Sequence, residues 1–333
     1  MIIQNNFSNE LKFLVNFLFN EDKVDNEEIL NLNLENLIKI ASRHLLLPAL
    51  FFEINKRKIT NLFPSKFTSY IQKIYNLNKQ RNTQIKDELI IVNSILKKKE
   101  IQFVFLKGCA MLLRNSYEDI GIRMIGDIDI LVDDKDYQEC IEIFTRENYR
   151  PLIKESFINT RHYPRMVNEK KLCAVEVHNK LLSSNRIFID YKKIFNRIVY
   201  CPFPVMDNSY MIQNCIYDYE VNDNGYIFCS INLKSFYDFK LLSPTELTFS
   251  DKYINSFLLK YRIITGIHIS NINFYKIRFI MKMKFKIYSI IDNFFVDRFL
   301  KFNIFFEKLY LYFANKNYRM YLFNKILKFY GRE

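Results

Sequence analysis

Two aspartates interrupt an apolar stretch near the middle of the chain, and they restrict what that stretch can form. Asp127 and Asp129 lie in the sequence GDIDILV, which ends at Val132 and is otherwise aliphatic after its glycine. Residues two apart share one face of a β-strand, so the two carboxylates face one way while Ile128 and Ile130 face the other. Like charges about 6–7 Å apart on one face repel each other unless a cation lies between them. We therefore predict a strand from Asp127 to Val132 whose polar face holds a cation.

Magnesium is the usual cation for such a pair, because it prefers oxygen ligands and binds through one or two carboxylates together with substrate phosphates. An Asp-x-Asp pair alone is a weak motif, since most such pairs are solvated strand ends or turns. Here the preceding sequence favours a metal site. Phe103–Leu106 predicts a short buried strand that ends at Lys107-Gly108, and a helix is expected over Cys109–Arg114.

A third acid follows in a matching pattern. In the sequence CAVEVHNKL, Val175 and Val177 alternate with Glu176 and His178, which is typical of a half-buried strand. If this strand pairs with the Asp-x-Asp strand, three carboxylates converge. Three acids around two magnesium ions form the arrangement used in nucleotidyl transfer, where the ions activate a hydroxyl and stabilise charge at the α-phosphate. The sequence leaves the pairing itself open.

These residues resemble the nucleotidyltransferase superfamily that includes DNA polymerase β, and within it the family of uncharacterised nucleotidyltransferases. The pattern of that family is L-K-G, then Y and R, then D-I-D-L-L-V, then an acid-x-His strand. The matching residues in this chain are Leu106-Lys107-Gly108, Tyr117, Arg123, Asp127–Val132 and Glu176-Val177-His178.

Weaker similarities extend the match to roughly Asn33–Leu242. They are Ala41–His44 with Pro48, and the later segment Leu233–Leu242 with Asp238. One departure is Gly108-Cys109, where the superfamily more often has Gly-Ser or Gly-Gly.

The resemblance implies an α+β fold, with a small mixed β-sheet nucleotidyltransferase core flanked by N-terminal and C-terminal helical regions. It also implies that Asp127 and Asp129 hold Mg²⁺ or Mn²⁺. Glu176 would complete the shell of the first metal and help to deprotonate the attacking hydroxyl. Lys107 and Gly108 would approach the triphosphate of the nucleotide, with backbone N–H groups of the following helix as an anion site.

Three of these side chains also have plain structural interpretations. Lys107 could instead pair with Glu118 or Asp119. Arg123 could neutralise phosphate charge in the transition state, or it could form a salt bridge that holds its loop. His178 could orient Glu176 or contact substrate, although a lone histidine on a strand is usually structural.

The chain is expected to divide into three regions. Residues 1–100 form a helical N-terminal subdomain, which includes a long helix over Ser65–Lys98 with an apolar stripe. Residues 101–200 form the nucleotidyltransferase core, in which a helix capped by Asp134 or Asp136 follows the Asp-x-Asp strand. Residues 201–333 form a helical region that is rich in basic and aromatic side chains.

The positive charge of the chain is concentrated at its C-terminal end. The net charge is +13, and residues 251–333 contain 16 Lys and Arg against 5 Asp and Glu, a net charge of +11. A basic surface with interleaved aromatic rings suits RNA or another polyanion. The alternative is a compositional bias toward Lys, Asn, Ile, Phe and Tyr, which places lysines on any solvated face. Aromatic residues at this spacing are more often the core side of helices.

The cysteines predict a reducing compartment. Six cysteines are scattered without a C-x-x-C pair, and no signal peptide precedes them, so we expect reduced thiols in a cytoplasmic protein. Four histidines without ligand spacing argue against a zinc site. No apolar run approaches the roughly 18 residues that a transmembrane helix requires.

The sequence thus predicts a metal-dependent nucleotidyltransferase that moves a nucleoside monophosphate from an NTP to a hydroxyl acceptor and releases pyrophosphate. The acceptor could be RNA, a protein side chain or a small molecule. RNA suits the basic segment 251–333, and the other two suit the long helical flanks equally well. The competing hypothesis is a non-catalytic module, in which a degenerate nucleotidyltransferase fold binds nucleotide or RNA without chemistry.

Overall fold

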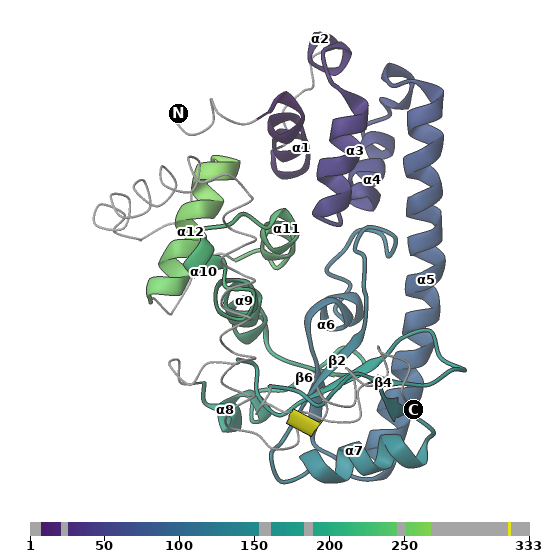
Figure 1. The fold of residues 1–333 in the computed structure, drawn as a ribbon, viewed down its shortest axis with the longest axis vertical. Helices are drawn as coiled ribbons and strands as arrows, with labels where there is room; N and C mark the ends of the chain where they lie inside the picture. The colour runs from purple at the N-terminus through teal and green to yellow at the C-terminus, as the bar shows by residue number, and fades with distance from the viewer. Residues whose placement is uncertain are drawn as a thin grey trace.

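The structure is a computed structural model that describes residues 8–20, 26–152, 161–182, 189–244, 251–267 and 319–320. Within this part of the chain, helices precede and follow a mixed β-sheet in sequence and flank it in space (Figure 1). This arrangement confirms the predicted α+β fold. Most of the aromatic and basic segment predicted beyond residue 267 lies outside the described residues. The division of the chain at residues 100 and 200 stays a prediction.

In the part of the chain that the structure describes, the sheet has seven short strands; in chain order they are β1 Phe103–Phe105, β2 Ile128–Val132, β3 Arg150–Pro151, β4 Met166–Val167, β5 Val175–His178, β6 Val199–Tyr200 and β7 Pro204–Val205. Their order in the sheet is β3-β4-β5-β2-β1-β7-β6. The central strand β2 pairs antiparallel with β1 and parallel with β5, so the sheet is mixed. All residues of β1, β2 and β5 are buried, which places the sequence-predicted acidic strands at the centre of the sheet.

Helices fill the N-terminal region, as predicted; they are α1 Asn9–Phe19, α2 Asn26–Leu30, α3 Leu34–Arg43, α4 Leu47–Lys56 and α5 Ser65–Lys98, with a 3₁₀ turn at Thr60–Leu62. The bounds of α5 are those expected from its apolar stripe. Ser8 caps α1 by accepting a hydrogen bond from the Leu11 amide, because a side-chain oxygen at this position satisfies an amide of the first turn.

Two helices cover the central strands. They are α6 Lys107–Leu113, which connects β1 to the loop before β2, and α7 Tyr137–Arg146, which follows β2 and begins after Asp136. Figure 1 shows α6 on one side of the sheet and α7 on the other. The helix expected over Cys109–Arg114 therefore begins two residues earlier, directly at the lysine of the Lys-Gly pair.

The C-terminal helices described are α8 Tyr191–Phe195, α9 Asn208–Tyr217, α10 Gly225–Phe228, α11 Leu233–Leu241 and α12 Lys252–Thr265, with a π-helix at Asp218–Asn222. The π-helix continues directly from α9, and α9 contacts α6, α11 and α12. Figure 1 shows α9 next to α6, on the same side of the sheet.

The long helix α5 holds in place the two segments that lead into the acidic strands β2 and β5. Asn78 donates hydrogen bonds to two carbonyls in the loop before β2. Arg81 donates to the Gly126 carbonyl at 2.9 Å, immediately before the Asp-x-Asp pair. Glu88 accepts from the Cys173 amide at 3.0 Å, immediately before β5. One rigid helix therefore sets the positions of two segments that are distant in sequence.

Among the described residues, no helix combines the length and the apolar character needed to cross a membrane.

The stability of the contact between α3 and α11 is expected to depend on pH. His44 accepts a hydrogen bond at Nδ1 from the Leu233 amide at 3.4 Å. Burial, assisted by the charge of Arg43, lowers the pKa of His44 to about 4 from 6.5. The unfolded chain therefore binds more protons as the pH falls through this window, so the folded state loses stability between about pH 6.5 and pH 4.

We expect the free energy of unfolding to drop by about 1–2 kcal/mol between pH 7 and pH 5 through this histidine alone. The replacement His44→Gln removes this titration, so the variant should lose less stability over the same interval. Urea unfolding of both proteins at the two pH values measures the difference. Equal losses in the two proteins would contradict the assignment.

Candidate active site

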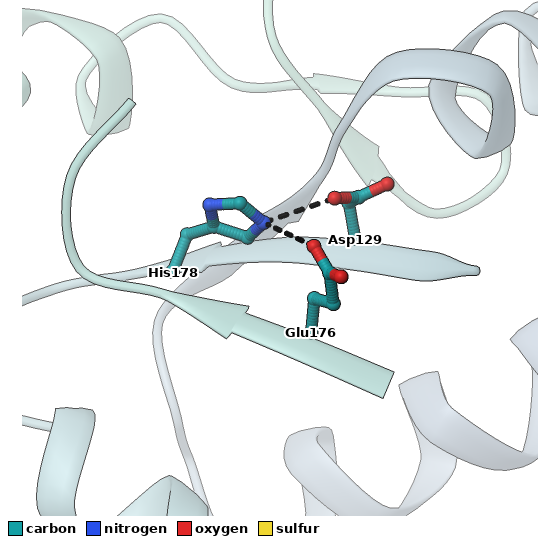
Figure 2. A group of neighbouring side chains, drawn as sticks. All are labelled: Asp129, Glu176 and His178. Carbon is teal, nitrogen blue, oxygen red and sulfur yellow. Dashed lines mark hydrogen bonds and ion pairs between the residues drawn. The ribbon is translucent and has the colours of Figure 1, made fainter. Parts of the chain in front are cut away.

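Asp129 and Glu176, two of the three acids predicted from the sequence, meet on one face of the sheet. The Cα atoms of Asp129 on β2 and Glu176 on β5 are register partners in the parallel pair, so their side chains leave the sheet side by side. His178, two residues further along β5, lies on the same face. Figure 2 shows the three side chains converging. One potential ligand atom from each lies within 4.8 Å of the others, so the strand pairing that the sequence left open does occur.

His178 holds the two carboxylates together. Its Nε2 lies 2.9 Å from Oδ1 of Asp129 and 3.5 Å from Oε2 of Glu176. An ionised carboxylate can only accept a hydrogen bond. The N–H group at Nε2 of His178 is therefore the donor, and Oδ1 of Asp129 is the acceptor. The ring is 1 % exposed, and it lies against the ring of His162 with centroids 4.9 Å apart. The side chain therefore orients the acids, which is one of the roles expected for it.

Lys107 is a second hydrogen-bond donor to Asp129, and it brings a positive charge to that carboxylate. The chain turns sharply after β1 because Lys107 adopts φ +50°, a left-handed conformation that is uncommon outside glycine. Its Nζ lies 2.7 Å from Oδ1 of Asp129, so the alternative of a pair with Glu118 or Asp119 is wrong. Burial opposes ionisation of Asp129, but the charge of Lys107 and the hydrogen bond from His178 outweigh it, and the pKa of Asp129 lies below its ordinary value.

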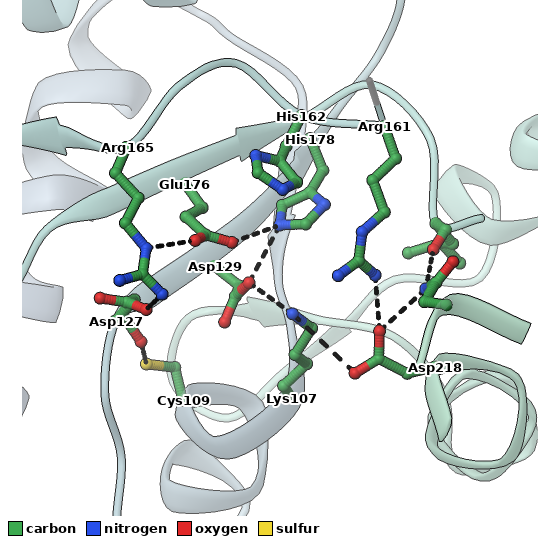
Figure 3. A network of polar contacts seen from close by, with 12 residues as sticks. Lys107, Cys109, Asp127, Asp129, Arg161, His162, Arg165, Glu176, His178 and Asp218 are labelled. Carbon is green, nitrogen blue, oxygen red and sulfur yellow. Dashed lines mark hydrogen bonds and ion pairs between the residues drawn. The ribbon is translucent and has the colours of Figure 1, made fainter. Parts of the chain in front are cut away.

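Arg165 bridges the other two acids. Its Nη2 lies 2.6 Å from Oδ2 of Asp127, and its Nε lies 2.7 Å from Oε1 of Glu176 (Figure 3). Burial alone would raise the pKa of Glu176, but hydrogen bonds from His178 and Arg165 lower it well below its usual range. The pKa of Asp127 is raised by burial and by the charges of Glu176 and Asp129, despite Arg165. All three predicted acids therefore interact electrostatically.

A fourth carboxylate reaches the site from the π-helix. Asp218 Oδ2 lies 4.0 Å from Nζ of Lys107, and its Oδ1 lies 2.5 Å from Nη1 of Arg161. Burial would raise the pKa of Asp218, but the charges of Lys107 and Arg161 lower it. Figure 3 shows Lys107 between Asp129 and Asp218. The lysine is thus shared between the acidic strands and the C-terminal helices.

Arg123 lies beneath the start of α6. Its Nε and Nη2 each donate to Asp238 of α11 at 2.8 Å, and its side chain is 9 % exposed. A Cβ at Gly108 would lie 3.4 Å from Arg123 Nη1 and 3.1 Å from the Ile125 side chain, so this position favours glycine. The Tyr117 hydroxyl donates to the Gly108 carbonyl at 3.4 Å. The salt-bridge interpretation of Arg123 has direct support here, while its contact with phosphate stays a prediction.

The donor set fits a divalent cation. Asp127, Asp129 and Glu176 offer carboxylate oxygens, which Mg²⁺ and Mn²⁺ prefer. In the structure these oxygens form ion pairs or hydrogen bonds with Arg165, Lys107 and His178, as Figure 3 shows. Coordination through Nε2 of His178 would require that nitrogen to lose its proton, so the oxygens are the better candidates for ligands.

Several residues at the site carry no motif that would identify them. Arg161, His162 and Arg165 belong to a stretch of mixed sequence without a clear helix or strand pattern, and the structure places them directly at the acids. Asp218 was not predicted. Its sequence, YDYEV, gives no pattern beyond a helix. It reaches Lys107 because α9, from which the π-helix continues, packs against α6.

Comparison with known families gives one match. The model of a protein family described as "Uncharacterised nucleotidyltransferase" matches residues 31–254. This range covers well over half of the chain and includes every residue of the site described above. No curated protein matches the chain.

Proposed function

The chain belongs to the uncharacterised nucleotidyltransferase family, which makes it a transferase of phosphorus-containing groups, and we propose that it is a metal-dependent nucleotidyltransferase. In this proposal, a nucleoside monophosphate moves from an NTP to a hydroxyl acceptor and pyrophosphate is released. The observation that carries it is the register pairing of Asp129 with Glu176, with Asp127 beside them. It supports three carboxylates acting together, as the reaction requires.

Asp127, Asp129 and Glu176 would hold Mg²⁺ or Mn²⁺, which would polarise the α-phosphate and make the acceptor hydroxyl more acidic. The residues of the chain supply the remaining functions. Glu176, with its depressed pKa, is ionised at neutral pH and can accept the hydroxyl proton. Lys107 lies where it can stabilise negative charge on the phosphates. His178 keeps the Asp129 carboxylate in one orientation.

The acceptor and the cellular location are further parts of the proposal. An RNA acceptor is supported by the basic segment 251–333, whose net charge is +11. Protein and small-molecule acceptors remain alternatives that the assay below separates. A cytoplasmic location is supported by the scattered cysteines, none of which forms a disulfide in the part of the chain that the structure describes.

A non-catalytic binding module is the second candidate, and one feature favours it. Cys109 occupies the position where the superfamily more often has serine or glycine. Its side chain is buried, and its Sγ lies 3.5 Å from the Asp127 carbonyl. Burial raises the pKa of this thiol, so it stays neutral and offers only a weak hydrogen bond to phosphate.

Label transfer tests the proposed function. The protein is incubated with magnesium and each of the four α-³²P-labelled NTPs, with total RNA, a protein extract and a small-molecule extract as separate acceptors. Label in one fraction identifies the nucleotide and the acceptor class together. Nucleotide binding without any transferred label would instead favour the binding module.

Removal of Arg165 is expected to strengthen metal binding. The same oxygens of Asp127 and Glu176 cannot serve the guanidinium and a divalent cation at once. Because the Arg165 side chain is 51 % exposed, its ion pairs are worth at most about 1 kcal/mol. We therefore expect Arg165→Ala to bind Mn²⁺ about two- to fivefold more tightly than the wild type.

Titration calorimetry with Mn²⁺ measures this change. Arg146→Ala is the matched control, because it removes an exposed arginine that pairs with Glu142 on α7. An unchanged or weaker Mn²⁺ affinity in Arg165→Ala would show that the arginine and the cation do not compete.

A further inference from the structure

A pocket lies next to the acidic residues, between α6, α9 and α11. It shares Lys107 with the acidic site and continues toward the helices. Charged, polar and apolar side chains line it. The charged ones are Lys107, Arg123, Asp218, Lys234 and Asp238. Three of these residues are cations and two are anions, so the lining carries an excess of positive charge.

Among the described residues, Lys234 is the cation of this lining that has no carboxylate within ion-pair distance. The guanidinium of Arg123 is paired with Asp238 at 2.8 Å, and Lys107 lies between Asp129 and Asp218. Lys234, at the start of α11, is partly buried. Among the described residues its ammonium forms no hydrogen bond or ion pair that would balance it. The charge of Arg123, together with burial, lowers the pKa of Lys234. The carboxylates of Asp238, Asp218 and Asp223 oppose this lowering. A phosphate anion in the pocket would act on Lys234 in the same direction as these carboxylates.

We propose that this pocket binds the β- and γ-phosphates of the nucleotide, and the pyrophosphate after transfer, with Lys234 as their ligand. The inference rests on the proposed function and extends it to residues of the C-terminal helices. An ammonium group with three donors is a suitable partner for phosphate oxygens. Lys107 connects the two parts, so an α-phosphate at the acids has its terminal phosphates directed toward Lys234.

This arrangement assigns a role in the reaction to the pocket. The acceptor oxygen forms a bond to the α-phosphorus, and the bond from this phosphorus to the bridging oxygen breaks. Pyrophosphate leaves with both electrons of that bond, and the hydroxyl proton passes to Glu176. Lys234 is placed to stabilise the negative charge that develops on the leaving group.

Binding of pyrophosphate in metal-free buffer tests the inference without requiring turnover. We expect Lys234→Gln to weaken pyrophosphate binding at least about tenfold, since one charge-assisted contact is lost. Binding of each NTP should weaken similarly, whereas binding of the corresponding monophosphate should not change. Lys234→Arg should retain most of the affinity. Lys97→Gln, with an exposed side chain near the end of α5, makes the same change in net charge and should have no effect.

The outcomes separate this inference from the proposed function. Loss of pyrophosphate affinity in Lys234→Gln, without any label transfer by the wild type, would support the pocket and reject the transferase. Label transfer by Lys234→Gln with unchanged KM for NTP and unchanged pyrophosphate affinity would overturn the pocket alone. Lys234→Met, which keeps the apolar stem, is the second variant if Lys234→Gln does not fold. An equal loss of affinity for monophosphate and triphosphate would also overturn the inference.

Discussion

Replacement of Asp129 by asparagine is expected to reduce nucleotidyl transfer by at least about 10²–10³-fold, the size of effect seen when one electrostatic group is removed from an active site. Asp129 is the acid on which the other groups converge. Its Oδ1 contacts both Lys107 and His178, and its carboxylate lies beside Glu176. Asparagine preserves the shape but supplies a neutral oxygen, so the proposed metal-binding set loses a charge at its centre.

The measurement is the initial rate of label transfer, together with Mn²⁺ affinity, for the wild type and Asp129→Asn. Both quantities should fall in the variant, while urea unfolding should show a folded protein. Asp134→Asn is the matched control, because Asp134 is an exposed acid just beyond the end of β2. A variant that keeps its transfer rate would exclude Asp129 as a metal ligand.

Replacement of Glu220 by glutamine is expected to destabilise the protein by about 3–5 kcal/mol. Glu220 and Lys260 form an ion pair at 2.5 Å in which both side chains are fully buried. Ser256 also donates to Glu220, at 3.0 Å. Burial raises the pKa of Glu220 despite the neighbouring ammonium. Removing one partner leaves the Lys260 charge in the interior without a carboxylate to balance it, and that is the costly change.

The free energy of unfolding in urea measures this effect. The double variant Glu220→Leu with Lys260→Met removes both charges and should recover most of the lost stability, because apolar replacement of a whole buried pair is often neutral. A single variant as stable as the wild type would contradict the prediction. Since Glu220 lies on the same π-helix as Asp218, the single variant should also weaken the contact between Asp218 and Lys107.

The sequence was sufficient wherever the decisive contacts are local. The bounds of α5 match those expected from the sequence. α7 begins after Asp136, one of the two residues expected to cap it, although the Asp136 side chain makes no capping hydrogen bond. The alternation in β2 and β5 correctly placed Asp129, Glu176 and His178 on polar faces.

By itself, then, the sequence determined the helices, the acidic strands and the family, because periodicity and motifs are read within a few neighbouring residues. Tertiary structure decided which charges meet. Lys107 pairs with Asp129, whereas Arg123 pairs with Asp238, 115 positions away. Arg165, Asp218 and Lys234 come to the site through segments whose own patterns predict only loops or helices. An ion pair depends on the distance between side chains in space, and strand register and helix packing fix that distance.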